Sequence, residues 1–135
     1  MPHQIIEYSA NLSNSLDIRA LVRAMHATAS GIEALPIAGL RTRAVCREVY
    51  EIADGHVDNA FIAVYLRILQ GRPLAVQQAV GEALFATLTE VVADIYESRP
   101  LALSFEIQEI NLDTRWKRGN IREYMAQRKT GNNDV

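Results

Sequence analysis

The sequence predicts an α/β (α+β) fold, in which two strand–helix–strand units form one four-stranded sheet with two helices on one face. The first observation is that a strand pattern, an amphipathic helix and a second strand pattern occur twice in order, at about 2–50 and 59–110. A helical crossover between two strands implies parallel pairing and a right-handed connection. The second observation is that residues 59–69 are apolar on both faces, which is typical of a strand covered on both sides.

Length and composition predict a single domain over residues 1–135, which is long enough to bury a core. The net charge of −2 gives no overall attraction to nucleic acid or membranes. No apolar run is long enough to span a bilayer, and the N-terminus lacks a signal-peptide pattern. The single Cys46 fits a reducing cytoplasm, and its alternating strand context predicts a buried, inert thiol.

The first unit begins with a strand over residues 2–8, which is rich in Ile and Tyr, and turn-forming residues follow at 9–14. A helix is expected from about Leu16 to Ser30, with Ser15 or Asn14 as its cap and Asp17 in its first turn. Its buried face follows helical spacing and consists of Ile18, Leu21, Val22, Met25 and Ala29. The helix is expected to end at Gly31.

The connection over residues 31–40 leads to a second strand at about 41–50, and Asp54-Gly55 marks a turn. The second unit starts with the apolar strand at about 59–69. Gly71-Arg72-Pro73 then turns the chain into a helix.

The second helix is expected over about 74–97, with Val76, Val80, Leu84, Leu88, Val91, Val92 and Ile95 on its inner face. Apolar and polar residues alternate in the last strand, 101–110. Both helices then cover one face of the sheet. Since the remaining tail is short, partner subunits are expected to cover the other face.

The tail, residues 111–135, contains six basic and three acidic residues. Ile121, Tyr124 and Met125 suggest one short helix, and Thr130 to Val135 are expected to fray. The basic tail is either a solvated arm or a segment that packs on a neighbouring subunit. The charges form no long cluster with interleaved aromatic residues, which argues against nucleic-acid binding.

Most kinds of catalytic site have no counterpart in the sequence. His3, His26 and His56 lack metal-ligand spacing, and His26 is expected on the helix surface. Glycine-rich phosphate loops and a GxSxG nucleophile motif are absent. No metal or cofactor is therefore expected.

Pro2 is the most informative residue that remains. Removal of Met1, which a small second residue favours, would make its nitrogen a secondary amine able to act as a base. While Met1 is attached, the same nitrogen is a non-basic amide. The alternative is that Pro2 only begins the strand, where a missing N–H costs little.

Arginines form the second candidate group, because twelve of the 14 Lys and Arg residues are Arg. Arg binds planar carboxylates bidentately, which favours an acidic ligand. Arg41 and Arg43 share one face of their strand, with Arg47 a weaker candidate on that face. Arg72 lies beside a helix N-terminus, where anions are favoured. Each of these arginines could instead form an ordinary surface or interface ion pair.

Several motifs in order resemble the 5-carboxymethyl-2-hydroxymuconate isomerase family. That family belongs to the tautomerase superfamily, with 4-oxalocrotonate tautomerase and macrophage migration inhibitory factor. The resemblance runs from Pro2 to about Ile110, whereas the tail matches poorly. The motifs are Pro2-His3-x-Ile-x-Glu7, Leu35-Pro36-Ile-Ala-Gly39-Leu-Arg41-Thr-Arg43, Ala53-Asp54-Gly55-x-x-Asp58-x-Ala60-Phe61, Gly71-Arg72 and Glu97-Ser98-Arg99-x-Leu-Ala-Leu-Ser-Phe-Glu106-Ile.

The resemblance implies a homotrimer of paired β-α-β units that isomerises a dienol tricarboxylate to its conjugated ketone in homoprotocatechuate breakdown. By matching position, Pro2 would carry the proton from the 2-hydroxyl to C5, and Arg41 would bind and polarise the 2-oxo end. Arg72 would bind a second carboxylate, with Arg43 as a helper. The alternatives are a related tautomerase acting on another acidic enol, or a trimeric binding scaffold without turnover.

Overall fold

The computed structural model describes residues 1–133, with the backbone alone for residues 131–133. Its sheet consists of β1 (His3–Ser9), β2 (Arg41–Arg47), β3 (Ala60–Leu69) and β4 (Leu101–Ile110). Its helices are α1 (Ile18–Ser30), α2 (Leu74–Val91), α3 (Ala93–Ser98) and α4 (Ile121–Asn133), with short 3₁₀ helices η1 (Ala10–Leu12), η2 (Ile37–Gly39) and η3 (Leu112–Thr114).

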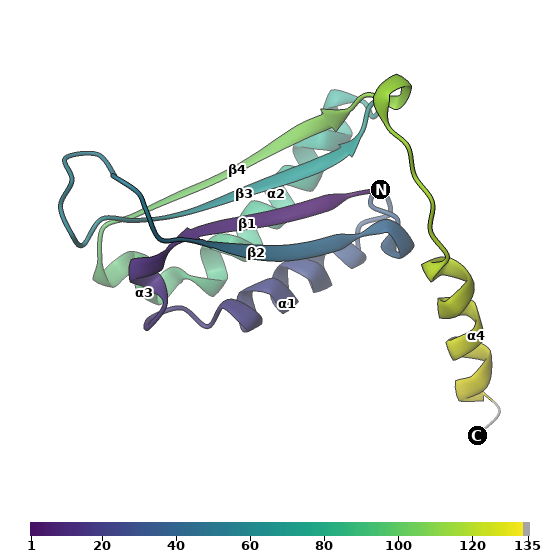
Figure 1. The fold of residues 1–135 in the computed structure, drawn as a ribbon, viewed down its shortest axis with the longest axis horizontal. Coiled ribbons are helices and arrows are strands. Elements are labelled where there is room, and N and C mark those ends of the chain that lie inside the picture. Colours follow the sequence, from purple (N-terminus) through teal and green to yellow (C-terminus); the bar gives the residue numbers. More distant parts are fainter. Residues whose placement is uncertain (134–135) are drawn as a thin grey trace.

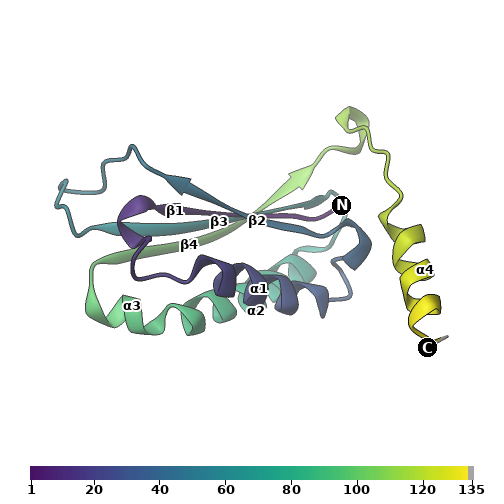
Figure 2. The same cartoon turned by 60° about the horizontal axis from the view of Figure 1, so that its bottom comes forward.

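The two predicted strand–helix–strand units are present. The strand order is β2-β1-β3-β4, with β1 parallel to β2, β3 parallel to β4, and β1 antiparallel to β3 where the units join. Both α1 and α2 lie on one face of the sheet, and none of the residues 1–133 forms a second layer on the opposite face (Figures 1 and 2). The predicted sheet with its two helices is therefore confirmed.

Helix α1 begins at Ile18, two residues later than predicted, because Asp17 is its cap. The Asp17 carboxylate accepts a hydrogen bond from Ala20 N at 3.1 Å, which satisfies a donor that the helix cannot pair internally. The prediction that Ser15 or Asn14 caps the helix is wrong. The predicted inner face is confirmed, since Leu21, Met25 and Ala29 are buried against the sheet, and Ile18 and Val22 pack on that core.

The predicted helix 74–97 is two helices, since α2 ends at Val91 and α3 begins at Ala93. Val92, between them, leaves helical geometry with φ −102° and ψ 15°. Adjacent helical residues point about 100° apart, so Val91 and Val92 point in different directions from the helix axis. Val92 is fully buried and Val91 is 41% exposed, which corrects the predicted inner face at Val91.

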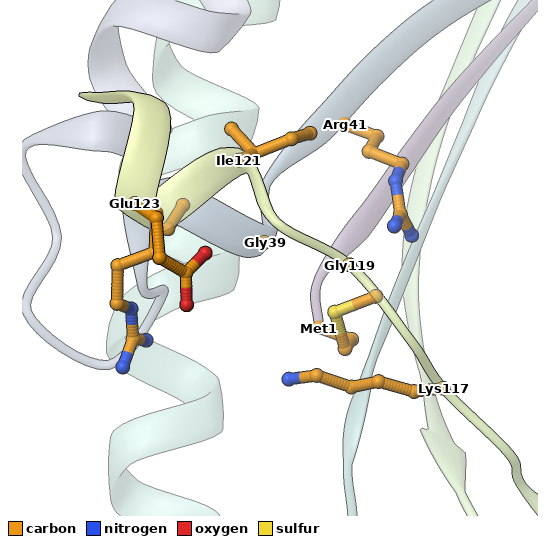
Figure 3. Close-up of a pocket in the computed structure, with 9 residues that line it drawn as sticks. Met1, Gly39, Arg41, Lys117, Gly119, Ile121 and Glu123 are labelled. Carbon is orange, nitrogen blue, oxygen red and sulfur yellow. The ribbon is translucent and has the colours of Figure 1, made fainter. Parts of the chain in front are cut away.

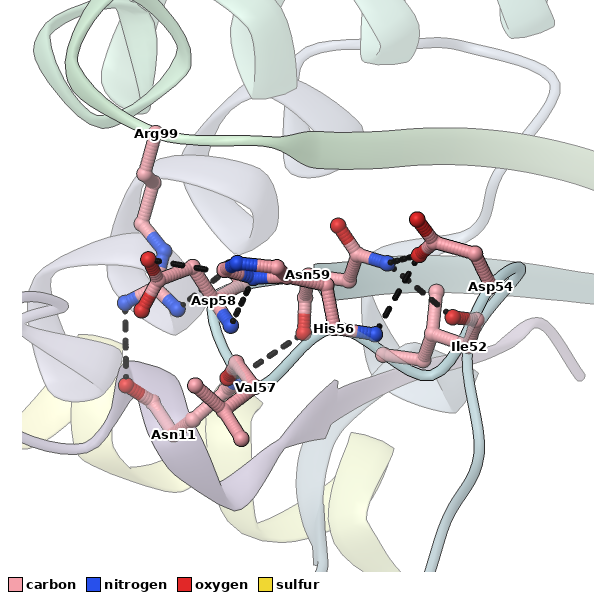
Figure 4. Close-up of polar contacts among 8 residues, drawn as sticks. All are labelled: Asn11, Ile52, Asp54, His56, Val57, Asp58, Asn59 and Arg99. Atoms are coloured by element: carbon pink, nitrogen blue, oxygen red, sulfur yellow. Dashed lines mark hydrogen bonds and ion pairs between the residues drawn. The ribbon is translucent and has the colours of Figure 1, made fainter.

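Strand β2 ends at Arg47 rather than near Tyr50, and residues 48–59 form a loop (Figure 4). The side chains of Asn11 and Arg99 hold this loop in place by hydrogen bonds to its backbone. Asn11 Nδ2 donates to Asn59 O at 2.7 Å and to Val57 O at 3.2 Å. Arg99 donates to Asn11 O at 3.1 Å and to Asp58 O at 2.8 Å. Backbone carbonyls of the loop are thus paired by side chains from outside it, so the loop needs no strand partner.

Two residues have surroundings that differ from the prediction. Cys46 is exposed rather than buried, because β2 is an edge strand of the sheet. His26 is half-buried rather than on the open surface, and its Nδ1 lies 2.8 Å from the Thr42 hydroxyl. The sequence pattern placed Cys46 on a strand and His26 on a helix. Their exposure depends on what packs beside them, which is little at the edge strand β2 for Cys46 and Thr42 of β2 for His26.

The tail helix α4 confirms the predicted helix around Ile121 and runs to Asn133. Fraying from Thr130 stays a prediction. Asp134 and Val135 lie outside the described residues. The tail leaves β4 at the end of the sheet that carries the N-terminus, and α4 descends beside that end (Figure 1). There α4 contacts η2 of the same chain. The tail is therefore not a solvated arm along its whole length, because α4 packs against its own chain at η2.

Candidate active site

The parallel pairing of β1 with β2 brings Pro2 and Arg41 together. Arg41 N donates to Pro2 O at 3.1 Å, and the next pair in register is His3 with Arg41. Pro2 is buried, whereas the Arg41 side chain extends into an exposed region. Two candidate residues that are far apart in the sequence are thus neighbours where β1 and β2 begin.

A cavity of about 200 Å³ lies at this meeting point. Its body side is formed by Met1, Arg41 and the η2 residues Ala38 and Gly39. Figure 3 shows the Lys117 side chain alongside Met1, with Arg41 projecting from the start of β2. The remaining lining residues come from the tail and are Lys117, Gly119, Ile121, Arg122 and Glu123.

Gly39 has no side chain, and the N-terminal residue Met1 occupies the space beside it. A Cβ atom built on Gly39 would come within 3.2 Å of both Cα and Sδ of Met1. Such contacts are tighter than ordinary van der Waals separation, so a larger residue here would push the N-terminus away from η2. While Met1 is attached, the glycine in the Leu35–Arg43 motif therefore has a steric reason at the candidate site.

The N-terminal amine lies in a cationic and partly desolvated environment. Burial lowers the pKa of this amine below its usual value, and the charges of Lys117, Arg115, Arg72 and Arg41 lower it further, in that order. Both causes disfavour an ammonium ion. In this chain the amine belongs to Met1. Without Met1, the secondary amine of Pro2 would lie one residue away, about 3.8 Å along the chain.

Arg43 lies on the open sheet face beside His3 and does not line the cavity. The Arg43 Nη1 is 3.2 Å from His3 Nδ1, and the Arg41 Nη1 is 3.3 Å from His3 Nε2. Burial and then the charges of Arg43, Arg41 and Arg67 lower the pKa of His3. A neutral imidazole has one acceptor nitrogen, so only one of the two guanidinium contacts is a hydrogen bond at a time.

Arg72 is held mainly by backbone carbonyls. Its Nε and Nη2 donate to Ala34 O at 3.0 and 2.6 Å, and its Nη1 donates to Leu69 O at 3.2 Å. The side chain therefore ties the turn after β3 to the connection before β2. It does not line the cavity, although its charge is among those that lower the pKa of the N-terminal amine.

Arg47 is farther along β2 and pairs with Glu7 at 2.8 Å, which makes it an ion-pair residue. Within the described residues, no group of three His, Cys, Asp or Glu side chains is arranged to hold a metal ion. Over the same range, none of the helices has the length and apolar character that crossing a membrane requires.

The tail residues of the cavity were not predicted. Composition did reveal that residues 111–135 are basic. However, no spacing relates Lys117 to Pro2, because their proximity depends on the path of the chain after β4. The excess of basic residues after the last strand was the one feature of the sequence that could have indicated that the tail lines the site.

Comparisons with known proteins agree with this architecture. The sequence model of the 5-carboxymethyl-2-hydroxymuconate isomerase family matches residues 2–125, so the similarity extends beyond Ile110, contrary to expectation. The 5-carboxymethyl-2-hydroxymuconate Delta-isomerase of Escherichia coli is 36% identical over 121 residues, which are 90% of this chain and 96% of the relative.

Solved structures show the same fold. A 5-carboxymethyl-2-hydroxymuconate isomerase from Deinococcus radiodurans R1 superposes with a TM-score of 0.85 at 33% identity, covering 92% of this chain and 93% of the relative. A fused 4-OT symmetric trimer superposes with a TM-score of 0.59 at 17% identity, with 87% and 92% covered. At that identity the second likeness is one of fold alone.

Proposed function

The chain belongs to the 5-carboxymethyl-2-hydroxymuconate isomerase family and is an isomerase with the tautomerase fold, and we propose that Pro2 is its proton shuttle. The proposed reaction converts 5-carboxymethyl-2-hydroxymuconate to its conjugated 2-oxo isomer during homoprotocatechuate breakdown in the cytoplasm. The observation that carries the proposal is the contact of Pro2 with Arg41 beside a cavity lined by cations.

The proposed proton transfer needs no other reactant. The Pro2 nitrogen, freed by removal of Met1, takes the proton of the 2-hydroxyl group. The oxygen electron pair then forms the 2-oxo group, and the conjugated electrons move to C5, which takes the proton back from Pro2. A base that both accepts and returns a proton works best with a pKa near the working pH. The pKa of the Met1 amine, one residue from the Pro2 nitrogen, is lowered by burial and nearby cations, and the same surroundings support this role for Pro2.

Arg41 has the second role in the proposal. Its guanidinium would bind the carboxylate and the oxygen at the 2-oxo end, and would stabilise the negative charge that develops when the 2-hydroxyl proton leaves. Arg72 would contribute its charge, and through its remaining N–H groups a second carboxylate contact. Arg43 would assist by keeping His3 neutral beside Arg41. Such a site stabilises a dienolate by preorganised charge.

We extend the proposal to the assembly: residues 1–135 form a single domain, and three copies form a homotrimer. The support is the face of the sheet opposite α1 and α2, on which Ala102, Ser104, Glu106 and Gln108 of β4 are exposed in this chain. On the same face, Phe61 and Tyr65 of β3 are only partly buried. Light scattering at several protein concentrations measures the assembly, and a monomer at all of them would contradict it.

The test combines an intact mass with an activity assay. Ultraviolet turnover of 5-carboxymethyl-2-hydroxymuconate is measured on a sample whose mass shows whether Met1 is absent. We expect rapid turnover without Met1, loss of it in Pro2→Ala, and a kcat/KM lower by about 10²–10³ in Arg41→Met. Undiminished activity with Met1 attached would exclude Pro2 as the base. A free Pro2 without turnover would favour another acidic enol as the substrate or a binding scaffold.

A further inference from the structure

The tail segment 115–123 forms one wall of the cavity at the N-terminus. Five of the nine lining residues belong to it, and it is held there because α4 contacts η2. The segment follows β4, so it comes from the opposite edge of the sheet to β2. The cavity therefore includes side chains that neither β-α-β unit supplies.

Lys117 lines the same cavity as the N-terminal residue Met1. Its ammonium is the strongest of the charges that lower the pKa of the N-terminal amine, and Figure 3 shows its side chain beside Met1. Within the described residues, Lys117 forms no ion pair, and the cavity contains one carboxylate, that of Glu123. An uncompensated ammonium in such a cavity favours an anionic ligand group.

The proposed substrate has a third carboxylate close to the carbon that is protonated. Two carboxylates belong to the muconate chain, and the third is at the end of a carboxymethyl arm on C5. C5 must approach the Pro2 nitrogen to within about 3–3.5 Å for proton transfer. Because the arm is one methylene long, its carboxylate must also lie close to this nitrogen.

We propose that Lys117 binds the carboxylate of the carboxymethyl arm, and that the tail thereby selects a dienol triacid over the corresponding diacid. The assignment rests on the proposed function, which supplies the geometry of the substrate. Arg41 is placed at the 2-oxo end, and three N–H groups of Arg72 are already paired with backbone carbonyls. Lys117 lies beside Met1 in the cavity, one residue from the Pro2 nitrogen that would face C5 (Figure 3).

The kinetic test compares two substrates and three variants. The substrates are 5-carboxymethyl-2-hydroxymuconate and 2-hydroxymuconate, which lacks the arm. The variants are Lys117→Met, Lys117→Arg, and Lys129→Met as a control that removes an exposed lysine of α4 outside the cavity. We expect Lys117→Met to raise KM for the triacid about tenfold or more and for the diacid less than twofold. Lys117→Arg should restore the triacid KM, and Lys129→Met should change neither.

Equal effects of Lys117→Met on both substrates, or no effect on either, would overturn the proposal. A second measurement keeps it testable if turnover fails. Trp116 is the only tryptophan, precedes Lys117 and is 87% exposed, so its fluorescence reports ligands near this wall. In a Pro2→Ala background, Lys117→Met should weaken binding of the triacid but not of the diacid. Selective binding, together with no turnover by the parent protein after Met1 is removed, would refute the proposed function alone, whereas unselective binding would refute the role of Lys117.

Discussion

Replacing Asn11 with alanine should lower the free energy of unfolding by about 2–3 kcal/mol. Asn11 lies in η1, directly after β1, and fastens the 48–59 loop at the end of the sheet opposite the N-terminus (Figures 1 and 4). Its Nδ2 donates to two loop carbonyls, and its Oδ1 accepts from Ser9 Oγ at 2.7 Å. Alanine removes all three hydrogen bonds.

The magnitude follows from how well water can replace each bond. A typical hydrogen bond contributes about 0.5–1.5 kcal/mol net, and more is lost when a buried partner stays unpaired. Ser9 is fully buried and its hydroxyl also accepts from Phe61 N at 3.0 Å, so its donor would be left without a partner. Val57 is 82% exposed, so water can solvate its carbonyl at little cost. Ser9 and Asn59 therefore account for most of the loss.

Urea denaturation at a fixed protomer concentration measures the effect, because assembly would otherwise change the apparent stability. Asn14→Ala is the matched control, since Asn14 is exposed in the neighbouring turn, and should stay within about 0.5 kcal/mol of the parent. Below its unfolding transition, Asn11→Ala should keep the parent kcat/KM. A loss no larger than that of the control would refute the assigned role of Asn11.

Three further predictions concern the core, Arg72 and His3. Leu84→Ala should cost about 2–5 kcal/mol in urea denaturation, because Leu84 is fully buried between α2 and the sheet; a change below 1 kcal/mol would contradict this packing. Arg72→Met should lower the melting temperature as well as kcat/KM, since it leaves the carbonyls of Ala34 and Leu69 without their donors; an unchanged melting temperature would refute this structural role. The pKa of His3 is lowered from 6.5 by burial and by Arg43 and Arg41, so the unfolded chain binds a proton more readily than the folded chain. The folded state should thus lose stability as the pH falls below about 6.5; His3→Gln should lessen this loss in melting curves between pH 7.5 and 5.5, and an unchanged slope would exclude His3 as its source.

Local patterns predicted the elements that pack against the sheet. The bounds of β4 agree with the structure, and the buried positions of α1 follow the predicted spacing. The same patterns predicted two parallel pairs because each crossover is a helix. Errors arose where more than one local solution existed, as at the cap of α1 and at the break between α2 and α3. At the cap, the outcome depends on which side chain accepts a hydrogen bond from the first turn of the helix, and this is Asp17. At the break, it depends on which residue is buried in the core, and this is Val92.

Some features in and around the candidate site were likewise predicted from the sequence, and others were not. Pro2 and Arg41 were predicted from residue type and position, and parallel register brings them together because β1 and β2 start side by side. The pairing of Arg72 with carbonyls, the exposure of Cys46 and the hydrogen bond of His26 were not predictable. The two hydrogen-bonded contacts depend on atoms supplied by distant segments, and the exposure of Cys46 depends on the position of β2 at the edge of the sheet.

The sequence by itself determined the two β-α-β units, the buried faces of their helices and the resemblance that directs attention to the N-terminal proline. Those features depend on periodicity and residue type, which act over a few residues. Only the tertiary structure decided that the tail returns to the N-terminus and places Lys117 beside it. The physical reason is that electrostatic and steric contacts depend on distance in space, and a path of more than a hundred residues separates these two ends of the site.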